Sequence, residues 1–380
     1  MVYRNGVPNM LSIIEQEGNI MIYKIGVLKG DDIGLEVVPA AVQVIKEALS
    51  LFPEIEVDWI DLPIGYTSYL ESGYTFPIET QEKLKELTGW ILGPIGHMAY
   101  PKDDPNAINP HPIIRKKFDM HSNVRPSLSY DSVNSIHKNV DLVVVRENNE
   151  GFQPDRNMFM GTGEFMPNPD LAMSVRVISR KNSTAVAETA FELAMQRRKK
   201  VTAIHKNTVY KLGCGLFVEC CREVAERYPE VEFDELIVDS AAAALVMKPQ
   251  NFDVLVTTNM FGDILSDLTS GLVGGLGMAP GLSIGSEYSM AQATHGSAPD
   301  ISGKQLANPY AMIMSGKMLV EWLAIKYKDK SLLQASKLIE VAVSEVILQG
   351  VTTPDMGGHS TTTEMTDAIC ILLKNKLPVS

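Results

Sequence analysis

Residues 257–268 read TTNMFGDILSDL, a stretch that places two aspartates, Asp263 and Asp267, four positions apart. The preceding FDVLV (252–256) is apolar and short enough for a strand, and the following TSGLVGGLG (269–277) predicts a glycine-rich loop. Side chains at i and i+4 of a helix share one face, where like charges repel by roughly a few tenths of a kcal/mol. The pair therefore indicates either a cation bound between the carboxylates or two acids favoured by the helix dipole, which suits Asp263 better than Asp267.

Strand-like and helix-like segments alternate on both sides of this stretch. The predicted strands are MIYKIGVL (21–28), GWILGPIG (89–96), VDLVVVREN (140–148), KKVTAIHKN (199–207), DELIVDS (234–240) and FDVLVTTN (252–259). Helical patterns separate them, among them LEVVPAAVQVIKEAL (35–49), STAVAETAFELAMQRR (183–198) and YKLGCGLFVECCREVAERY (210–228). This order predicts an α/β protein with a largely parallel sheet.

Length and composition restrict the class of protein. A chain of 380 residues exceeds what one hydrophobic core usually organises, so two domains are expected. The net charge of -12 argues against a nucleic-acid partner and gives no reason to expect binding to an anionic membrane. No apolar run is long enough to cross a bilayer.

The N-terminal residues and the cysteines indicate a cytoplasmic protein. Residues 1–20 lack the apolar segment of an export signal and are expected to be a loose extension before the first strand, or the product of an upstream start codon. The cysteines show neither CxxC pairing nor metal-ligand spacing, which predicts reduced thiols in a cytoplasm-like compartment; they are Cys214, Cys220, Cys221 and Cys370.

Charged side chains follow four of the predicted strands. VDLVVV ends in Arg146, VTAI in His205-Lys206, ELIV in Asp239, and FDVLV leads to Asp263. Ligands of open α/β sheets bind outside the carboxyl ends of the strands. Any one of these residues could be ordinary surface, but together they favour a polar active site.

The residue types fit metal-assisted chemistry beside a carboxylate. Guanidinium groups match carboxylates with two hydrogen bonds, which suits Arg115, Arg125 and Arg146. Carboxylates are hard ligands suited to Mg²⁺ or Mn²⁺, and the candidates are Asp239, Asp263 and Asp267. A lysine beside such a cluster, here Lys206, is a candidate general acid or base.

Several motifs then resemble the isocitrate and isopropylmalate dehydrogenases, which are metal-dependent β-decarboxylating dehydrogenases. The matching stretches, in family order from Met21 onward, are IRKKFDMHSNVRP, VVVREN, HKNTV, IVDS, NMFGDILSDL and HGSAPDISGKQLANP. The resemblance implies substrate binding by Arg115, Arg125 and Arg146, and catalysis by Lys206 assisted by Asp239. It also implies that Asp239, Asp263 and Asp267 bind the metal.

The resemblance further implies a two-domain fold that is not a Rossmann fold, and the chain has no G-x-G-x-x-G after any strand. Residues 21–120 plus 274–380 would form the first domain and residues 121–273 the second. The protein would be a homodimer with shared sites, in which Lys206 and Asp239 of one subunit complete the site of the other. Residues 156–180 would lie in the dimer-forming region.

The resemblance also implies NAD as cofactor. The adenosine-binding loop would comprise His295, Gly296, Ser297, Ala298, Asp300 and Asn308. Asp300 stands where NADP-dependent relatives of the isocitrate type have a basic residue, and a carboxylate there can bond ribose hydroxyls and repel a 2'-phosphate. The alternative is that Asp300 is only a turn residue after Pro299.

The expected reaction is oxidative decarboxylation of a 3-substituted malate-type 2-hydroxy acid to a 2-oxo acid and CO2. The residues expected to contact the third substituent are Ile108, Asn109, His111 and Pro112. They match neither the apolar set of isopropylmalate enzymes nor the serine and asparagine of isocitrate enzymes. Within the class of 3-isopropylmalate, (R)-malate, tartrate and isocitrate, the mixture favours (R)-malate, tartrate or an alkylmalate over isocitrate.

Departures from the family pattern leave a second hypothesis open. Gln153 stands where the family usually has a tyrosine that helps protonate the enol, and Thr208 replaces an asparagine. GDDIG (30–34) replaces the commoner GDGIG, and Gln292 stands where a glutamate often precedes the loop. A catalytically idle paralogue that binds ligand as a regulatory or structural subunit is therefore the alternative.

Overall fold

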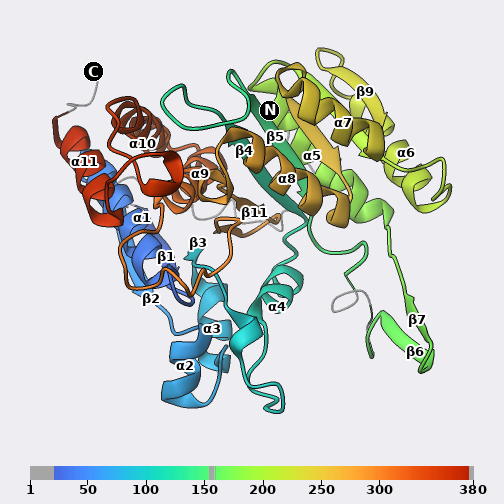
Figure 1. Ribbon diagram of the computed structural model, residues 1–380, viewed down its shortest axis with the longest axis horizontal. Coiled ribbons are helices and arrows are strands. Elements are labelled where there is room, and N and C mark those ends of the chain that lie inside the picture. The colour runs from blue at the N-terminus through green and yellow to red at the C-terminus, as the bar shows by residue number, and fades with distance from the viewer. Residues whose placement is uncertain (1–20, 154–157, 159, 376–380) are drawn as a thin grey trace.

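A ten-stranded sheet runs through the computed structural model, which describes residues 21–153, 158 and 160–375 (Figure 1). The order across the sheet is β2-β1-β3-β12-β11-β4-β5-β10-β8-β9. These strands are β1 (Ile22–Leu28), β2 (Glu56–Asp61), β3 (Gly89–Leu92), β4 (Ser122–Leu128), β5 (Asp141–Glu147), β8 (Lys200–His205), β9 (Glu232–Ile237), β10 (Val254–Thr257), β11 (Leu282–Ile284) and β12 (Ser289–Ala291). Both flanks of the sheet are parallel, and the central pairs β12-β11, β11-β4 and β4-β5 are antiparallel. The predicted α/β fold is confirmed.

Helices cover both flanks of the sheet (Figure 1). The flank that contains β1 and β3 packs against α1 (Gly34–Leu49), α9 (Tyr310–Tyr327), α10 (Lys330–Leu348) and α11 (Thr362–Asn375) in one large apolar core. The flank that contains β5, β8 and β10 packs against α5 (Arg180–Met195) and α6 (Gly213–Ala225) in a second core. The remaining helices are α2 (Gly65–Ser72), α3 (Ile78–Lys83), α4 (Pro110–Lys117), α7 (Val238–Met247) and α8 (Asn259–Val273).

The strand register brings several predicted site residues to one edge of the sheet. Thr257 at the end of β10 pairs with Arg146 on β5 and with Ile204 on β8. On the far side of β8, His205 pairs with Ile237 at the end of β9. Because these four strands are parallel and end together, the segments that follow them start from the same edge.

The helix after β10 is longer than the sequence predicted. The stretch 269–277 was expected to be a glycine-rich loop, but α8 continues to Val273. Leu265, Leu272 and Val273 are buried in α8, so burial of apolar side chains outweighs the low helix propensity of Gly271. The loop begins at Gly274, whose φ of 139° a residue with a side chain rarely adopts.

The two predicted domains divide the sheet between them. β1–β3, β11 and β12 lie within residues 21–120 and 274–380, whereas β4, β5 and β8–β10 lie within residues 121–273. The domain boundaries stay a prediction. The expected extension, residues 1–20, lies outside the described residues.

A two-stranded antiparallel hairpin stands apart from the main sheet (Figure 1). It consists of β6 (Glu164–Asn168) and β7 (Leu171–Ser174), and every residue of both strands is exposed. The hairpin belongs to the segment expected at a dimer interface, of which residues 156, 157 and 159 lie outside the described part.

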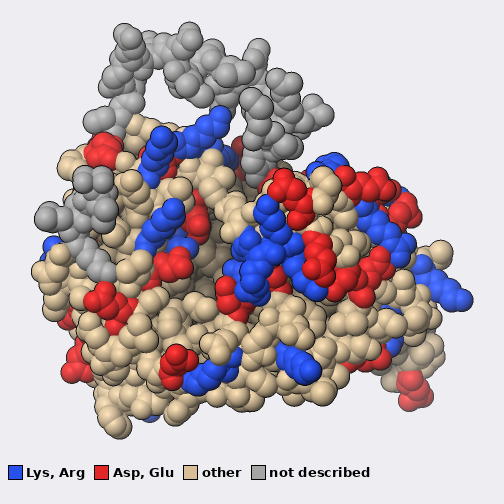
Figure 2. Space-filling view, turned by 90° about the horizontal axis from the view of Figure 1, so that it is seen from above, with Lys and Arg blue, Asp and Glu red and all other residues tan. Residues whose placement is uncertain are grey.

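None of the helices in the described part of the chain is long and apolar enough to cross a membrane. On the face shown in Figure 2, lysines and arginines are interspersed with aspartates and glutamates around a central hollow. All four cysteines are buried and free.

Candidate active site

Two buried arginines and one aspartate form the centre of the site. Arg125 on β4 is 7% exposed and Arg146 on β5 is 3% exposed. Nη1 of Arg125 donates a hydrogen bond to Oδ1 of Asp263 at 3.0 Å, and Nη1 of Arg146 donates to the same oxygen. The arginines lie on adjacent antiparallel strands, and α8 places the carboxylate against both. A single carboxylate therefore offsets part of the charge of two buried guanidinium groups.

Further polar groups accept hydrogen bonds from the two arginines. The side-chain oxygen of Asn259 accepts from Nε of Arg146 at 3.0 Å and from Nη2 at 2.6 Å. The hydroxyl of Ser266 accepts from Nη1 of Arg125 at 2.7 Å. Both acceptors are on α8, so this helix supplies three of the groups that hold the arginines in place.

The second aspartate of the opening pair lies one helical turn further along α8. Oδ1 of Asp267 is 3.7 Å from Nη1 of Arg125, so Arg125 is a cation between the two carboxylates. Burial raises the pKa of Asp263, but the charges of Arg146 and Arg125 outweigh burial and hold this pKa below its ordinary value. Burial raises the pKa of Asp267 above its ordinary value, against the opposing charge of Arg125.

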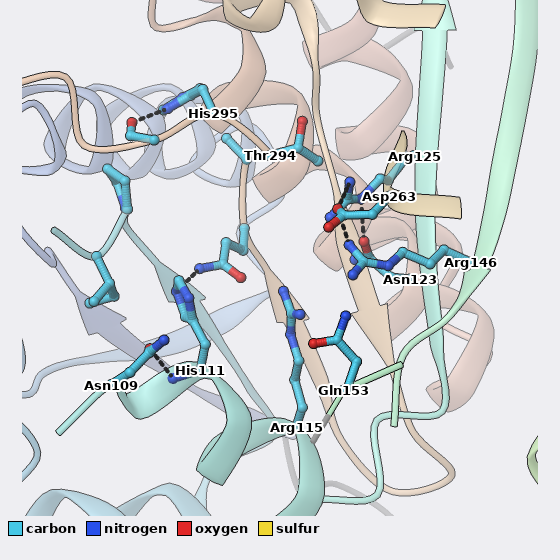
Figure 3. A pocket seen from close by; sticks show the side chains of 15 residues that line it. Asn109, His111, Arg115, Asn123, Arg125, Arg146, Gln153, Asp263, Thr294 and His295 are labelled. Atoms are coloured by element: carbon cyan, nitrogen blue, oxygen red, sulfur yellow. Dashed lines mark hydrogen bonds and ion pairs between the residues drawn. The ribbon is translucent and has the colours of Figure 1, made fainter. Parts of the chain in front are cut away.

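A polar cavity of about 290 Å³ adjoins the two arginines (Figure 3). Arg115 reaches it from α4, so all three arginines predicted to bind carboxylates line one space. Its other lining residues are Pro94, Ile95, Asn109, His111, Asn123, Gln153, Asp263, Gln292, Ala293, Thr294, His295 and Gly296.

Of the residues expected to read the third substituent of the substrate, Asn109 and His111 line the cavity. Asn109 caps α4, because its side-chain oxygen accepts from the backbone N–H of His111 at 3.1 Å. The ring of His111 is hydrogen-bonded to the amide of Gln292 at 2.6 Å, and the contact is drawn in Figure 3. Ile108 does not line the cavity, because its side chain packs against the apolar cluster around Trp90. Pro112 does not line it either.

The predicted catalytic pair lies elsewhere on the same sheet edge. Nζ of Lys206, after β8, is 2.5 Å from Oδ1 of Asp239 in the first turn of α7. Neither residue lines the cavity, since β10 separates β8 from the arginine strand β5. The hydrogen bond from Lys206 lowers the pKa of Asp239. In the described part of the chain, no three His, Cys, Asp or Glu side chains are grouped to hold a metal ion, so Asp239 does not join Asp263 and Asp267 within one chain.

The loop expected to bind adenosine borders the cavity, and two features fit a dinucleotide. Nε2 of His295 is buried and has no hydrogen-bond partner within the described residues. No atom lies within 4 Å of the place where a Cβ of Gly296 would be, so the backbone is open to a ligand there. Ser297 accepts through its backbone carbonyl from the N–H of Ile33 at 3.1 Å, and this bond fixes the loop against the start of α1.

The other three residues of that predicted set differ in their surroundings. Asp300 is exposed, and Ala298 has a φ of 45°. Asn308 is buried and already engaged, because its amide donates to Asp355 at 3.0 Å and its oxygen accepts from the N–H of Tyr310 at 2.9 Å. The side chain of Asn308 therefore has a structural role in this conformation.

Sequence reasoning missed the thiol beside the predicted catalytic lysine. Sγ of Cys214 accepts from the backbone N–H of Lys206 at 3.3 Å and from the guanidinium of Arg176 at 3.4 and 3.5 Å. Arg176 in turn lies against the rings of Phe152, Tyr210 and Phe261. The sequence suggested only a reduced thiol, because nothing in its spacing pairs residue 214 with residue 176.

The comparisons with known proteins identify the family of the chain. Residues 24–369 match the family model described as isocitrate/isopropylmalate dehydrogenase. The chain belongs to the isocitrate/isopropylmalate dehydrogenase family.

Relatives within the family differ in the substrates they are named for. The chain is 38% identical over 362 residues to the 3-isopropylmalate dehydrogenase of Archaeoglobus fulgidus, covering 92% of this chain and 99% of the relative. It is 38% identical over 356 residues to the isocitrate/homoisocitrate dehydrogenase of Thermus thermophilus, covering 93% of this chain and 100% of the relative. The crystal structure of isocitrate dehydrogenase from Methylococcus capsulatus superposes with a TM-score of 0.81 at 38% identity, covering 93% of this chain and 99% of that one.

The close packing of α8 on β5 yields a test of how Arg146 is positioned. A Cβ at Gly262 would lie 2.6 Å from Cγ and 2.7 Å from Cβ of Arg146, so Gly262→Ala forces the arginine or the helix to shift. We expect the affinity for dicarboxylates to fall about tenfold or more, and the free energy of unfolding to fall by about 1–3 kcal/mol. Titration calorimetry and thermal unfolding measure the two effects.

Gly271→Ala on the same helix is the matched control, because a Cβ there meets no atom within 4 Å. The control is expected to keep the affinity and to be as stable as the parent or more so. Equal affinities of the two variants would show that Gly262 does not position Arg146.

Proposed function

We propose that this protein is an NAD- and divalent-metal-dependent enzyme that oxidatively decarboxylates a malate-type 2-hydroxy acid. It belongs to a family of β-decarboxylating dehydrogenases, and the one observation that carries the proposal is the convergence of Arg115, Arg125 and Arg146 on one cavity beside Asp263. Three guanidinium groups in a small polar space suit a ligand with two or three carboxylates.

Each residue set has a distinct task in this reaction. The arginines bind and orient the carboxylates, and Lys206 takes the proton of the 2-hydroxyl group, assisted by Asp239. Asp263 and Asp267 offer carboxylate oxygens at side chains that are 48% and 53% exposed, which fits a hard cation. Bound Mg²⁺ or Mn²⁺ would supply polarisation of the hydroxyl oxygen and of the carbonyl that replaces it. Bound NAD would accept the hydride from C2.

We propose further that the active form is a homodimer with shared sites. Lys206 and Asp239 lie away from the cavity of their own chain, so a second subunit has to bring these groups to it. Large apolar side chains are exposed near both parts, including Leu212 at 89% and Ile264 at 58%. Such side chains suit coverage by another subunit. The exposed β6–β7 hairpin adds Phe165, Met166, Leu171 and Met173 to the apolar surface available.

The surroundings of Asp300 and of the four cysteines support the proposed cofactor and compartment. An exposed carboxylate at Asp300 favours NAD over NADP, because it would repel a 2'-phosphate. Free, buried thiols at all four cysteines favour a cytoplasm-like compartment.

A substrate panel tests the proposal directly. With Mn²⁺ present, we expect NADH formation from (R)-malate, tartrate or a 3-alkylmalate, with lower turnover of isocitrate and with little NADPH formation when NADP is supplied. Removal of the metal with a chelator should abolish turnover, and added Mn²⁺ should restore it. If no acid is turned over while dicarboxylates still bind, the protein is the idle ligand-binding paralogue that Gln153 and Thr208 suggest.

The metal site is tested at Asp267 and not at Asp263, whose carboxylate also holds the two buried arginines. We expect Asp267→Asn to raise the Mn²⁺ concentration needed for half-maximal activity by about 10- to 100-fold. The unfolding temperature should change little, because Asp267 is farther from Arg125 than Asp263 is. The same change at exposed Asp131 is the control. Unaltered activity of Asp267→Asn at limiting Mn²⁺ would remove Asp267 from the metal site.

The substrate preference is tested at His111, the polar residue whose ring meets Gln292. We expect His111→Leu to shift relative kcat/KM toward apolar 3-alkylmalates by about tenfold, because leucine replaces a polar ring at the cavity wall with an apolar side chain that suits an alkyl substituent. Ile108→Val is the matched control, since Ile108 lies outside the cavity. The proposal for His111 fails if all acids of the panel respond equally.

A further inference from the structure

The loop before α1 carries an acidic residue in a conformation that favours glycine. In GDDIG (30–34), Asp32 has a φ of 48° and stands where the family motif more commonly has glycine. Aspartate is among the few residues that tolerate the left-handed region, yet the conformation still costs stability. Residues held in this way often occur at functional sites, so contacts of the side chain decide whether Asp32 has a function.

Neighbouring Asp31 fixes the position of Asp32. The carboxylate of Asp31 is buried and accepts hydrogen bonds from the backbone N–H of Tyr66 at 2.6 Å, from that of Gly96 at 2.7 Å and from the hydroxyl of Tyr100 at 2.6 Å. These bonds tie the loop before α1 to the first turn of α2 and to the segment that follows β3, and they engage both oxygens of Asp31. The adjacent residue is therefore held on a rigid frame.

The carboxylate of Asp32 has no such internal use. Asp32 is half-buried, and in the described part of the chain its side chain makes neither a hydrogen bond nor an ion pair. A Cβ at Gly96 would lie 3.1 Å from Oδ2 of Asp32 and 3.0 Å from Oγ of Ser297. A carboxylate and a hydroxyl therefore converge on the space that Gly96 leaves open.

This space joins the two parts of the proposed active site. Gly96 is next to Ile95, which lines the arginine cavity, and Ser297 follows His295 and Gly296, which line it too. Ser297 belongs to the loop that would hold the adenosine half of the cofactor. A dinucleotide that extends from this loop to the arginine cavity passes the convergence point of Asp32 and Ser297.

We propose that Asp32 binds the ribose of the nicotinamide half of the dinucleotide by accepting hydrogen bonds from its two hydroxyl groups. The inference rests on the proposed NAD dependence. A carboxylate repels the diphosphate, and nicotinamide itself has to face the hydroxy acid in the arginine cavity, so the ribose between them is the part that suits Asp32. Asp32 would then have a role on the nicotinamide side that parallels the one expected of Asp300 on the adenosine side.

A competing explanation is that Asp32 only complements the dipole of α1. The structure offers little support for it, because the residue at the N-cap is Ile33 and no side chain caps this helix. The two explanations predict different measurements. A dipole role affects stability and leaves cofactor affinity unchanged, whereas a ribose contact affects affinity.

Three variants of the 380-residue chain separate these effects. Asp32→Asn keeps the size and the tolerance of a positive φ but removes the charge, and Asp32→Gly also relieves the backbone. Asp58→Asn removes one charge at an exposed position on β2 and is the matched control. The dissociation constants of NAD, NADP and ADP are measured by titration calorimetry without hydroxy acid, together with the unfolding temperature.

We expect both Asp32 variants to bind NAD about tenfold more weakly than the parent and to bind ADP, which lacks the nicotinamide half, equally well. Asp32→Asn should keep the unfolding temperature of the parent, and Asp32→Gly should raise it.

Unchanged NAD affinity of both variants would overturn the inference and leave the proposed function intact. Equal weakening of NAD and ADP would overturn it too, because the contact would then lie on the adenosine half. A parent protein that binds neither NAD nor NADP would overturn this inference and the proposed function together. A parent protein that binds only NADP, and binds it more weakly after Asp32→Asn, would support the ribose contact and correct the cofactor.

Discussion

Two guanidinium groups lie buried on adjacent strands, and the rest of the site depends on how their charge is held. A buried charge without a partner costs several kcal/mol, on the order of 3–5 when one member of a pair is lost. Arg125 and Arg146 avoid this cost because α8 presents Asp263, Asn259 and Ser266 to them. The approach of this helix is close enough that only glycine fits at position 262. The cationic site is thus built into the packing of a helix on the sheet.

The same constraint explains why the site can receive an anion. Three arginines face Asp263 and Asp267, and Arg125 already lies between the two carboxylates. A divalent cation at these carboxylates would add positive charge to the cavity. A substrate with two or three carboxylates would oppose that charge, which links the proposed metal to the proposed substrate.

Much of this could be predicted from the sequence, because the signals were local. Apolar strands followed directly by Arg146, Lys206 and Asp239 indicated the functional edge of the sheet, and register confirms that these strands end together. The failures came from tertiary packing. Leu272 and Val273 extend α8 through an apparent loop, and Ile108 packs against an apolar cluster although Asn109, the next residue, lines the cavity.

Other features had no local signal at all. The antiparallel strand β4 was not identified, since Pro126 interrupts a stretch that also carries Arg125, and a proline usually argues against a strand in the middle of a sheet. The contact of Cys214 with Arg176 joins residues 38 positions apart.

The environment of Glu147 also had no signal in the sequence. Its carboxylate accepts hydrogen bonds from the backbone N–H groups of Asn149 and Glu150, and this turn leads the chain toward Gln153 at the cavity. Burial raises the pKa of Glu147 to about 7, a result that depends on surroundings the sequence does not display.

Within one chain, the proposed catalytic pair does not line the arginine cavity, so one chain alone does not hold a complete site. Lys206 and Asp239 satisfy each other at 2.5 Å while the arginines are satisfied by α8, so neither group needs the other for folding. Changes at cavity residues such as His111 and Gln292 would then leave the ion pair of Lys206 and Asp239 in place. A site divided in this way would become complete only in the proposed dimer, where Lys206 of the second subunit would take the hydroxyl proton. Relatives of this chain are named for isopropylmalate and for isocitrate and homoisocitrate, and a divided site would let the cavity differ among them while the proposed proton-transferring pair stays the same.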